Sequence, residues 1–259
     1  MGDKKNLNNS LDKTLNMLAY FNEDRQVIGL SELSRLSGIP KATVYRMIST
    51  LEAHGFINRV DVLGKENQYK LGLRFLEYGK LVSNGLEIRN IALPHMAKFR
   101  DKVNECVQLI VRDNDEAMYI EKLECKQFIR LYTRIGRRAP LYGGACPRAI
   151  LTFLPDEEID RILNSVNLVK YTKNTVVDKK KLKEMIEQDR QRGYTVSYGE
   201  LEPETVAIGA PIFDHKGNVA GSLSVAGPDS RFTEKELPYL TDELLKTTRE
   251  ISKALGYNK

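Results

Sequence analysis

The turn Gly38-Ile39-Pro40 constrains the fold more than any other feature, because it separates two short helical patterns. The glycine suits the left-handed conformation that follows a helix end. The proline suits the first position of the next helix, where a missing N–H has no helical partner. The preceding pattern, residues 31–37, begins at Ser31 as its expected N-cap, and the following pattern covers residues 40–54. Two helices joined by so tight a turn predict a helix-turn-helix.

The second of these helices has one apolar face and one polar face. Val44, Ile48 and Leu51 recur at helical spacing and are expected to point inward. Arg46 on the outer face has the geometry for a bidentate contact with guanine. The pattern predicts a recognition helix, although a three-helix bundle with a solvated outer face fits the same residues. The candidate DNA contacts on this helix are Lys41, Ala42, Thr43, Tyr45, Arg46 and Ser49.

The segments on either side complete a small N-terminal module. Residues 10–21 form a helical pattern with Ser10 as N-cap and an apolar stripe of four side chains, Leu11, Leu15, Leu18 and Phe21. Residues 56–60 and 68–71 alternate like strands around a polar tip and predict a hairpin. We expect this hairpin to lie along the DNA backbone or minor groove as a wing. Further candidate DNA contacts are Ser31 on the preceding helix and, on the wing, Arg59, Lys65, Asn67 and Lys70.

Charge permits nucleic acid as a partner without requiring it. The 259 residues carry 40 Lys+Arg against 35 Asp+Glu, a formal net charge of +5. So weak a basic excess predicts that DNA binding is reinforced by oligomerisation. No apolar run approaches the roughly 18 residues of a membrane span, so no membrane partner is expected. Three widely spaced cysteines without a CxxC pair indicate a reducing cytoplasm and no structural metal.

The rest of the chain predicts a larger α+β domain after a helical connector. Residues 73–86 and 87–103 form two amphipathic helices, the second of which contains Pro94. Because neighbouring strands form hairpins with helices between them, the sheet is expected to be largely antiparallel. Strands are expected at residues 106–112, 117–123, 128–133, 194–198, 206–213 and 219–226. Helices are expected at residues 147–154, 156–164, 178–192 and 233–255, the last with Thr233 as its N-cap.

Three segments of this domain suit a small-molecule pocket, which combines an apolar lining with a few polar groups. Residues 141–146 place small side chains before the start of a helix. The free N–H groups at such a helix start can hold a carboxylate. Residues 197–207 lie between two strands, and residues 222–226 put alternate side chains on one face. The candidate pocket residues are Tyr142, Gly143, Gly144, Ala145, Cys146, Ser197, Glu200, Ala207, Ser222, Ser224 and Ala226.

Dispersed motifs follow one another in order from Ser10 to Gly256. They include LSELSRLSGIPKATVYRMISTLEAHGFI, QYKLGLRFLEYG, GRRAPLYGGACPRAIL and VAIGAPIFDHKGNVAGSLSVAGP. Together they resemble the IclR (isocitrate lyase regulator) family of bacterial transcription factors. The resemblance implies a winged helix-turn-helix over residues 1–72 and a linker helix over residues 73–85. It also implies an effector-binding and oligomerisation domain of GAF/PAS-like fold over residues 86–259.

The same resemblance implies a function. A protein of this kind is a ligand-responsive transcriptional regulator, usually a repressor of a metabolic or catabolic operon. Its partners are double-stranded operator DNA and a small-molecule effector, an organic acid or an aromatic compound. It is expected to work in the cytoplasm as a homodimer or homotetramer, without a metal or other cofactor.

This sequence departs from the family pattern at positions that matter for specificity. The usual Lys-Ser-Thr of the recognition helix is Lys41-Ala42-Thr43 here, so the operator sequence is not transferable from other members. The usual Gly-Lys before the helix alanine is Pro147-Arg148. Ala207 and Ala226 stand where some members carry a cysteine and a serine. We therefore expect a less polar pocket and a larger or more apolar effector.

Two other classes of function fit some of the same residues. A small-molecule enzyme would use Cys146 or Glu200 in the pocket, with the N-terminal module serving assembly only. The chain has no GxxxxGK[ST], GxGxxG, GxSxG or HExxH motif, and Cys146 is expected to be an inert core residue. An architectural DNA binder would show steep salt dependence and no sequence preference. The sequence favours transcriptional regulation over both.

Overall fold

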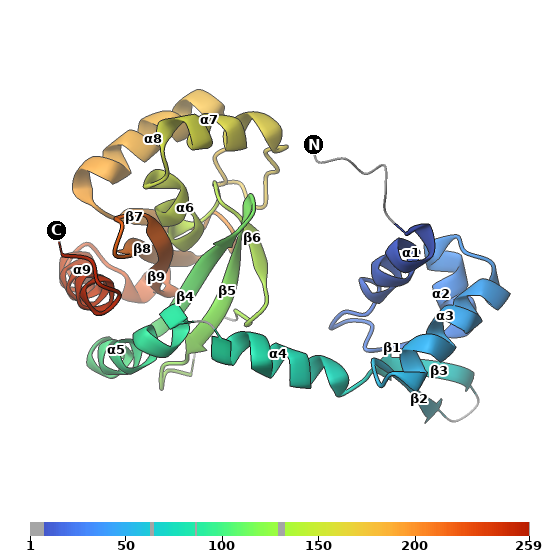
Figure 1. Ribbon diagram of the computed structural model, residues 1–259. Helices are drawn as coiled ribbons and strands as arrows, with labels where there is room; N and C mark the ends of the chain where they lie inside the picture. The colour runs from blue at the N-terminus through green and yellow to red at the C-terminus, as the bar shows by residue number, and fades with distance from the viewer. Residues whose placement is uncertain (1–7, 63–64, 86, 129–132, 259) are drawn as a thin grey trace. The chain divides into compact units, whose positions relative to one another are not determined.

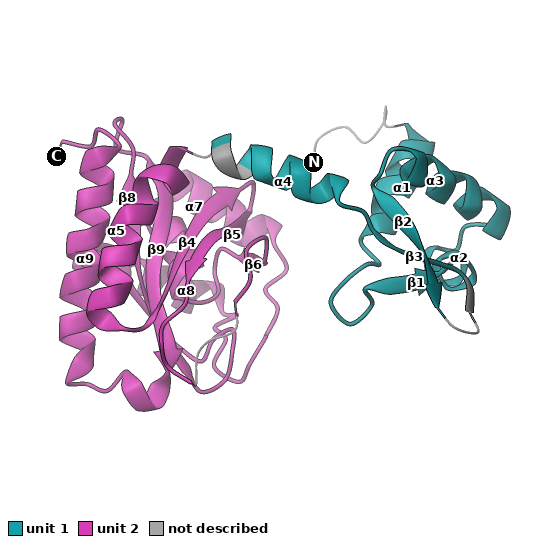
Figure 2. Cartoon of the chain, turned by 90° about the horizontal axis from the view of Figure 1, so that it is seen from below, with its two compact units in different colours: residues 1–85 teal, residues 86–259 magenta. Residues whose placement is uncertain are grey.

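The computed structural model describes residues 8–62, 65–85, 87–128 and 133–258. The chain divides into two compact units, residues 1–85 and 86–259 (Figure 2). One hydrophobic core lies in the first unit and two lie in the second. In the part of the chain that the structure describes, no helix is long and apolar enough to cross a membrane.

The first unit packs three helices against a small antiparallel sheet with the strand order β1-β3-β2 (Figure 1). Helices and strands share one core, in which Met17, Ile28, Leu33, Ile48 and Tyr69 are almost fully buried. Ile28 lies opposite Tyr69 in the register of β1 and β3. The elements are α1 (Asn9–Leu18), β1 (Val27–Gly29), α2 (Leu30–Ser37), α3 (Lys41–Ala53), β2 (Ile57–Val62), β3 (Lys65–Leu71) and α4 (Arg74–Gly85).

The predicted turn between α2 and α3 is confirmed. Gly38 has a left-handed φ of 68°, and the Ser34 hydroxyl donates to the Ile39 carbonyl at 2.7 Å. The predicted N-cap Ser31 is wrong, because α2 begins one residue earlier and its cap position is Gly29, without a side-chain hydrogen bond. The short strand β1, which the sequence did not predict, runs directly into α2, and its last residue takes the cap position.

The apolar stripe predicted for α1 is only partly buried. Leu11 and Leu15 are 57% and 56% exposed, whereas Met17 is fully buried. The helix also begins earlier than expected, since Asn8 rather than Ser10 is the N-cap; its side chain accepts hydrogen bonds from two N–H groups of the first turn. Part of the apolar surface of α1 is therefore left uncovered by its own unit.

The second unit is a six-stranded sheet in which every neighbouring pair is antiparallel, with the order β6-β5-β4-β9-β8-β7. Helices α5 and α9 pack on one face, and α6, α7 and α8 share a core with the other (Figure 1). The α+β class predicted from the sequence is confirmed. The helices are α5 (Glu87–Val103), α6 (Ala145–Thr152), α7 (Asp156–Ser165), α8 (Lys179–Arg192) and α9 (Glu236–Ala254). The strands are β4 (Cys106–Asp113), β5 (Glu116–Leu123), β6 (Arg138–Pro140), β7 (Thr195–Tyr198), β8 (Thr205–Phe213) and β9 (Val219–Pro228).

Two expectations for the second unit need correction. The strand predicted at residues 128–133 falls mostly outside the described residues, and Phe128 itself lies in a bend. On its outer side, β5 pairs with the short β6, which the sequence did not predict. Thr233 does not cap α9 with its side chain: the helix begins at Glu236, whose N–H donates to the Thr233 carbonyl at 3.0 Å.

Gly72 should not tolerate a side chain. A Cβ at this position would lie 2.1 Å from the Gly55 carbonyl oxygen. We expect Gly72→Ala to destabilise the first unit by about 2 kcal/mol, because backbone must move to relieve the overlap. Gly79→Ala is the matched control, because it lies exposed in α4 with no atom within 4 Å of its Cβ; it should stabilise by about 1 kcal/mol. Urea unfolding followed by circular dichroism measures both, and equal effects of the two variants would contradict the prediction.

Candidate DNA-reading surface and effector cavity

Helix α3 buries one face and exposes the other. Val44, Met47 and Ile48 are buried, while Tyr45 is 50% exposed and Arg46 is also exposed. Within the described residues, Arg46 makes no ion pair and no side-chain hydrogen bond. The remaining candidates on this helix are exposed or, for the last, half-buried: Lys41, Ala42, Thr43 and Ser49. The polar face predicted for this helix is thus open to a partner.

The hairpin of β2 and β3 forms the predicted wing. The Arg59 guanidinium donates from Nη2 to Asn67 Oδ1 at 2.6 Å across the two strands. This bond limits the conformations of the Arg59 side chain, and Lys70 is exposed on the same hairpin. The side chain of Lys65 lies outside the described residues. Ser31 is exposed on α2, where its hydroxyl does not cap the helix.

A cavity of about 40 Å³ lies between the N-terminus of α6 and strands β4, β5, β7, β8 and β9. Strand pairing assembles it, because Gln108 lies opposite Ser224 and Ala207 lies opposite Ala226. Gly209 lets α6 approach the sheet, since a Cβ there would lie 2.7 Å from the carbonyl oxygen at the start of this helix. The predicted residues that line the cavity are Gly144, Ala145, Cys146, Ser197, Ala207, Ser224 and Ala226.

Three of the other predicted residues do not line the cavity. The Tyr142 hydroxyl accepts from the Val169 N–H at 2.7 Å and donates to the Val169 carbonyl at 3.2 Å, which ties a loop to the turn before α6. Gly143 belongs to the same buried turn and does not line the cavity. The Ser222 hydroxyl donates to the Cys146 carbonyl at 2.7 Å. The Tyr142 and Ser222 hydroxyls therefore bond to neighbouring backbone groups of the same unit.

Most of the hydrogen-bonding side chains in the lining were not among the predicted residues. Gln108 Nε2 donates to Thr133 Oγ1 at 2.9 Å, and the Ser224 hydroxyl lies 3.4 Å from Gln108 Oε1. A single polar side chain in the otherwise apolar start of β4 was the signal that could have identified Gln108. These groups give the lining hydrogen-bonding capacity beyond that of the predicted residues. The missed lining residues are Gln108, Tyr119, Thr133, Arg137, Pro147, Leu201, Glu202 and Thr205.

Cys146 does not have the properties of a nucleophile. Burial raises the pKa of its thiol to about 12, against a smaller lowering effect of the Ser222 and Ser224 hydroxyls. Near neutral pH the residue is therefore a thiol rather than a reactive thiolate. Among the described residues, no cluster of His, Cys, Asp and Glu could hold a metal ion.

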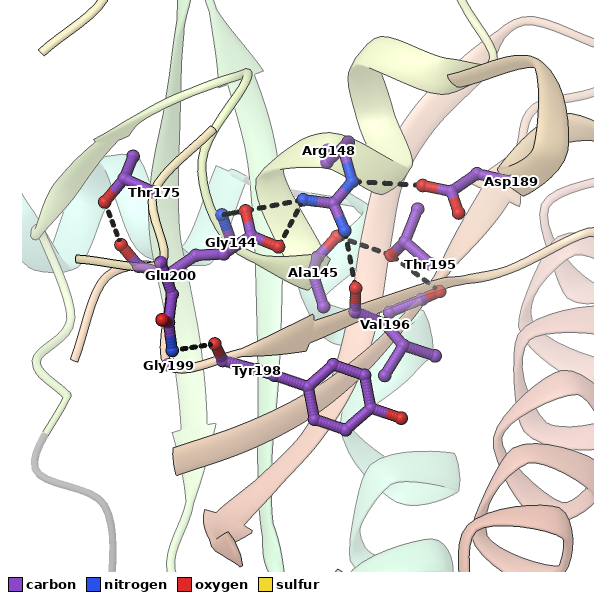
Figure 3. A network of polar contacts seen from close by, with 12 residues as sticks. Gly144, Ala145, Arg148, Thr175, Asp189, Thr195, Val196, Tyr198, Gly199 and Glu200 are labelled. Carbon is purple, nitrogen blue, oxygen red and sulfur yellow. Dashed lines mark hydrogen bonds and ion pairs between the residues drawn. The ribbon is translucent and has the colours of Figure 1, made fainter. Parts of the chain in front are cut away.

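Glu200, the last predicted pocket residue, is held in a buried ion pair (Figure 3). Arg148 has no exposed surface. Its Nη1 donates to the two Glu200 oxygens at 2.7 and 2.6 Å, its Nε to Asp189 at 3.0 Å, and its Nη2 to the Val196 carbonyl at 2.5 Å. Glu200 also accepts the Gly144 N–H at 3.1 Å. This carboxylate therefore fixes the N-terminus of α6 and serves neither as a free acid for the effector nor as a catalytic group.

Removing the Arg148 guanidinium should destabilise the second unit strongly. Arg148→Met leaves Glu200 buried without a cation and Asp189 with Arg192 as its remaining partner, and breaking a buried ion pair typically costs about 3–5 kcal/mol. Burial already raises the pKa of Asp189 against the lowering effect of Arg148 and Arg192, and losing Arg148 should raise this pKa further. A carboxyl whose folded pKa exceeds its unfolded value binds a proton on folding. The loss of stability should therefore be largest at high pH and shrink as the pH falls through the raised pKa.

Chemical unfolding at several values between about pH 5 and 8 measures this effect. The control is Arg161→Met, which removes an exposed pair with Asp115 and should change stability little at any pH. A loss of stability in Arg148→Met that is the same at all pH values would contradict the role given to the buried carboxylates.

Comparison with known proteins identifies both units. The family model described as "IclR helix-turn-helix domain" matches residues 10–61, and the one described as "Bacterial transcriptional regulator IclR C-terminal" matches residues 80–253. The HTH-type transcriptional regulator KipR of Bacillus subtilis (strain 168) is 48% identical over 253 residues, which cover 98% of this chain and 99% of KipR. The HTH-type transcriptional repressor AllR of Escherichia coli (strain K12) is 30% identical over 247 residues, which cover 95% of this chain and 90% of AllR.

A solved structure shares the fold over nearly the whole length. It is an IclR homolog of Microbacterium hydrocarbonoxydans complexed with 4-hydroxybenzoate, with a TM-score of 0.80 and 25% identity. The match covers 95% of this chain and 98% of that one. The chain therefore belongs to the IclR family of bacterial transcriptional regulators, which join a DNA-binding helix-turn-helix to a C-terminal effector-binding domain and are not enzymes.

Proposed function

We propose that this regulator is an effector-controlled repressor of a metabolic or catabolic operon, acting in the cytoplasm. Residues 1–72 would bind the operator, residues 73–85 would form the linker helix, and residues 86–259 would bind the effector and hold the oligomer. The open polar face of α3 carries this proposal, because a guanidinium at its centre has no partner within the described residues. Repression is supported by AllR, which is named a transcriptional repressor.

The recognition helix and the wing divide the contacts with DNA. Arg46 suits a bidentate contact with guanine O6 and N7 in the major groove. Lys41, in the first turn of α3, suits a phosphate that also faces the helix N–H groups. Ala42 offers only an apolar contact, such as one with a thymine methyl group. Arg59 on the wing, held by Asn67, suits the backbone beside the groove.

Uncovered apolar side chains support a homo-oligomer. On α1, Leu11 and Leu15 are more than half exposed, and α4 exposes a further set of large apolar groups. So many large apolar side chains left exposed by their own unit favour an interaction site. A dimer would place two recognition helices on successive half-sites, about 34–36 Å apart on the duplex. The exposed apolar residues at and just before α4 are Leu73, Phe75, Leu76, Leu81 and Val82.

The effector is proposed to be an organic acid or an aromatic compound bound in the cavity at α6. Polar groups from several strands converge there, including Gln108, Thr133 and Ser224. Arg137 lines the same cavity and pairs with Glu202 at 2.7 Å, so an acidic effector would compete with Glu202 for this cation. A cavity of about 40 Å³ holds little more than a water molecule. Binding a metabolite therefore requires the lining to move.

This movement gives a route from effector to DNA. A ligand shifts a conformational equilibrium only by binding one state more tightly than the other. An effector that opens the cavity would favour the open state of the second unit, and the linker would pass the change to the spacing of paired recognition helices. This spacing decides whether both half-sites are contacted together.

Arg46→Ala should remove specific operator binding without unfolding the protein. We expect the affinity for a duplex from the region upstream of the protein's own gene to fall about 10- to 100-fold, since a bidentate guanine contact contributes about 1–3 kcal/mol of discrimination. Fluorescence anisotropy with this duplex and a scrambled one measures the change. The charge-matched control is Lys180→Ala, which removes an exposed cation of α8 and should leave the affinity unchanged. Equal affinity of the unmodified protein for both duplexes would refute the proposed function.

Arg137→Gln should weaken binding of acidic effectors. We test a panel of aliphatic and aromatic carboxylates and their amides. The acid that binds the unmodified protein best should bind the variant at least about 10-fold more weakly, because a charge-assisted contact is lost. The neutral amides should bind both proteins alike. Arg138→Gln is the matched control, because Arg138 pairs with Asp113 and Glu116 away from the cavity. Calorimetric titration measures the affinities, and equal losses in both variants would count against a role of Arg137 in the site.

A further inference from the structure

A second hollow of the effector-binding unit lies apart from the cavity at α6. Its volume is about 630 Å³, and its walls come from the ends of α6 and α8, from β8, and from the C-terminal half of α9 with the residues that follow it. It shares no lining residue with the effector cavity. We infer that this hollow, here called the aryl-anion groove, is a second small-molecule site that takes a flat aromatic anion. This inference goes beyond the proposed function.

Three aromatic rings in a row form one wall of the groove. Phe153 and Phe213 pack edge to face with ring centroids 5.7 Å apart. Phe213 and Tyr257 stack with centroids 5.1 Å apart and an interplanar angle of 29°. Tyr257 follows α9, and its N–H donates to the Ser252 carbonyl at 2.9 Å, which holds the ring over the groove. A row of partly exposed rings favours a flat aromatic ligand, because stacked and edge-to-face contacts add to the burial of apolar area.

The charge of the groove has one sign. The lining includes Arg192, Arg249 and Lys253 and no Asp or Glu. Arg192 already pairs with Asp189, but Arg249 and Lys253 make no ion pair or side-chain hydrogen bond within the described residues. These two cations are four residues apart on α9 and so share one helix face. Two unpartnered cations beside aromatic rings are complementary to a carboxylate, sulfonate or phosphate on an aromatic ring system.

The backbone beside the groove is not suited to an added peptide strand. Pairing with β7 ends at Thr195 opposite Gly209, so the rest of β8 has no neighbouring strand on this edge among the described residues. Pro211 has no N–H, and the Phe213 N–H already donates to the Ser252 hydroxyl at 3.0 Å. Strand addition needs free main-chain donors on such an edge. A small aromatic anion fits the groove better than an extended peptide.

Anilinonaphthalene sulfonate is a suitable probe, because it is an aromatic anion that fluoresces when bound in apolar surroundings. Titration of the full chain should show a saturable site that Arg249→Glu combined with Lys253→Glu weakens about 10-fold or more. The matched control combines Lys235→Glu with Lys246→Glu, which changes the net charge equally at exposed positions of the same region outside the groove. Tyr257→Ala should weaken the same site, whereas Tyr239→Ala, an exposed tyrosine of α9 outside the groove, should not.

Competition identifies the anion. Displacement of the groove-dependent signal by benzoate assigns the site to aryl carboxylates, and displacement by adenosine monophosphate assigns it to nucleotides. Operator affinity measured on the same variants should equal that of the unmodified protein, which separates this site from DNA binding. Equal weakening by both charge-reversed pairs would overturn the inference. So would a change in oligomeric state, measured by sedimentation, that is confined to the groove variants, because the groove would then be an interface between copies of the chain.

Discussion

The buried Arg148 guanidinium is the interaction on which the second unit depends. A cation taken out of water is costly unless carboxylates and hydrogen bonds surround it, and here they come from α8, from β7 and from the segment after β7. These consecutive segments, whose contact residues lie 41 to 52 residues after Arg148, are thereby held against α6. Because Glu200 also accepts the Gly144 N–H, the first turn of α6 and one wall of the cavity beside it are positioned by the same ion pair.

The winged module was predictable because most of its signals are local. Gly38 marks a helix end through its own backbone conformation, and Val44 and Ile48 mark the inner face of α3 by spacing alone. The errors have a common cause. A hydroxyl near a helix start is compatible with capping, but the path of the preceding backbone decides which residue takes the cap position. In α2 this residue is Gly29 and not Ser31. Apolar spacing shows that α1 is amphipathic without showing what covers Leu11, which its own unit leaves exposed.

The cavity was predictable only in part, because its walls depend on strand pairing between distant segments. Strand alternation correctly placed Ser224 and Ala226 on one face. Gln108 reaches the same face only because β4 pairs with β9, which lies 116 residues further along the chain at this contact. The same reason explains why Glu200 was predicted to contact the ligand. An acid at a strand end suggests such a contact, yet its partner is Arg148, 52 residues away in the sequence. No stretch of sequence near Glu200 indicates this partner.

The pairing of Ala207 with Ala226, side by side in one wall of the cavity, limits how such a regulator could be converted into a biosensor. Both positions already carry the smallest side chain other than glycine, so space for a bulkier analyte is not available from this wall. Enlargement would have to begin at Leu201 or Tyr119, whose truncation creates room while the main-chain ladder of β8 and β9 stays unchanged. Substitutions at Leu201 and Tyr119 would therefore change which ligands fit the cavity, whereas the wall formed by β8 and β9 would keep its shape.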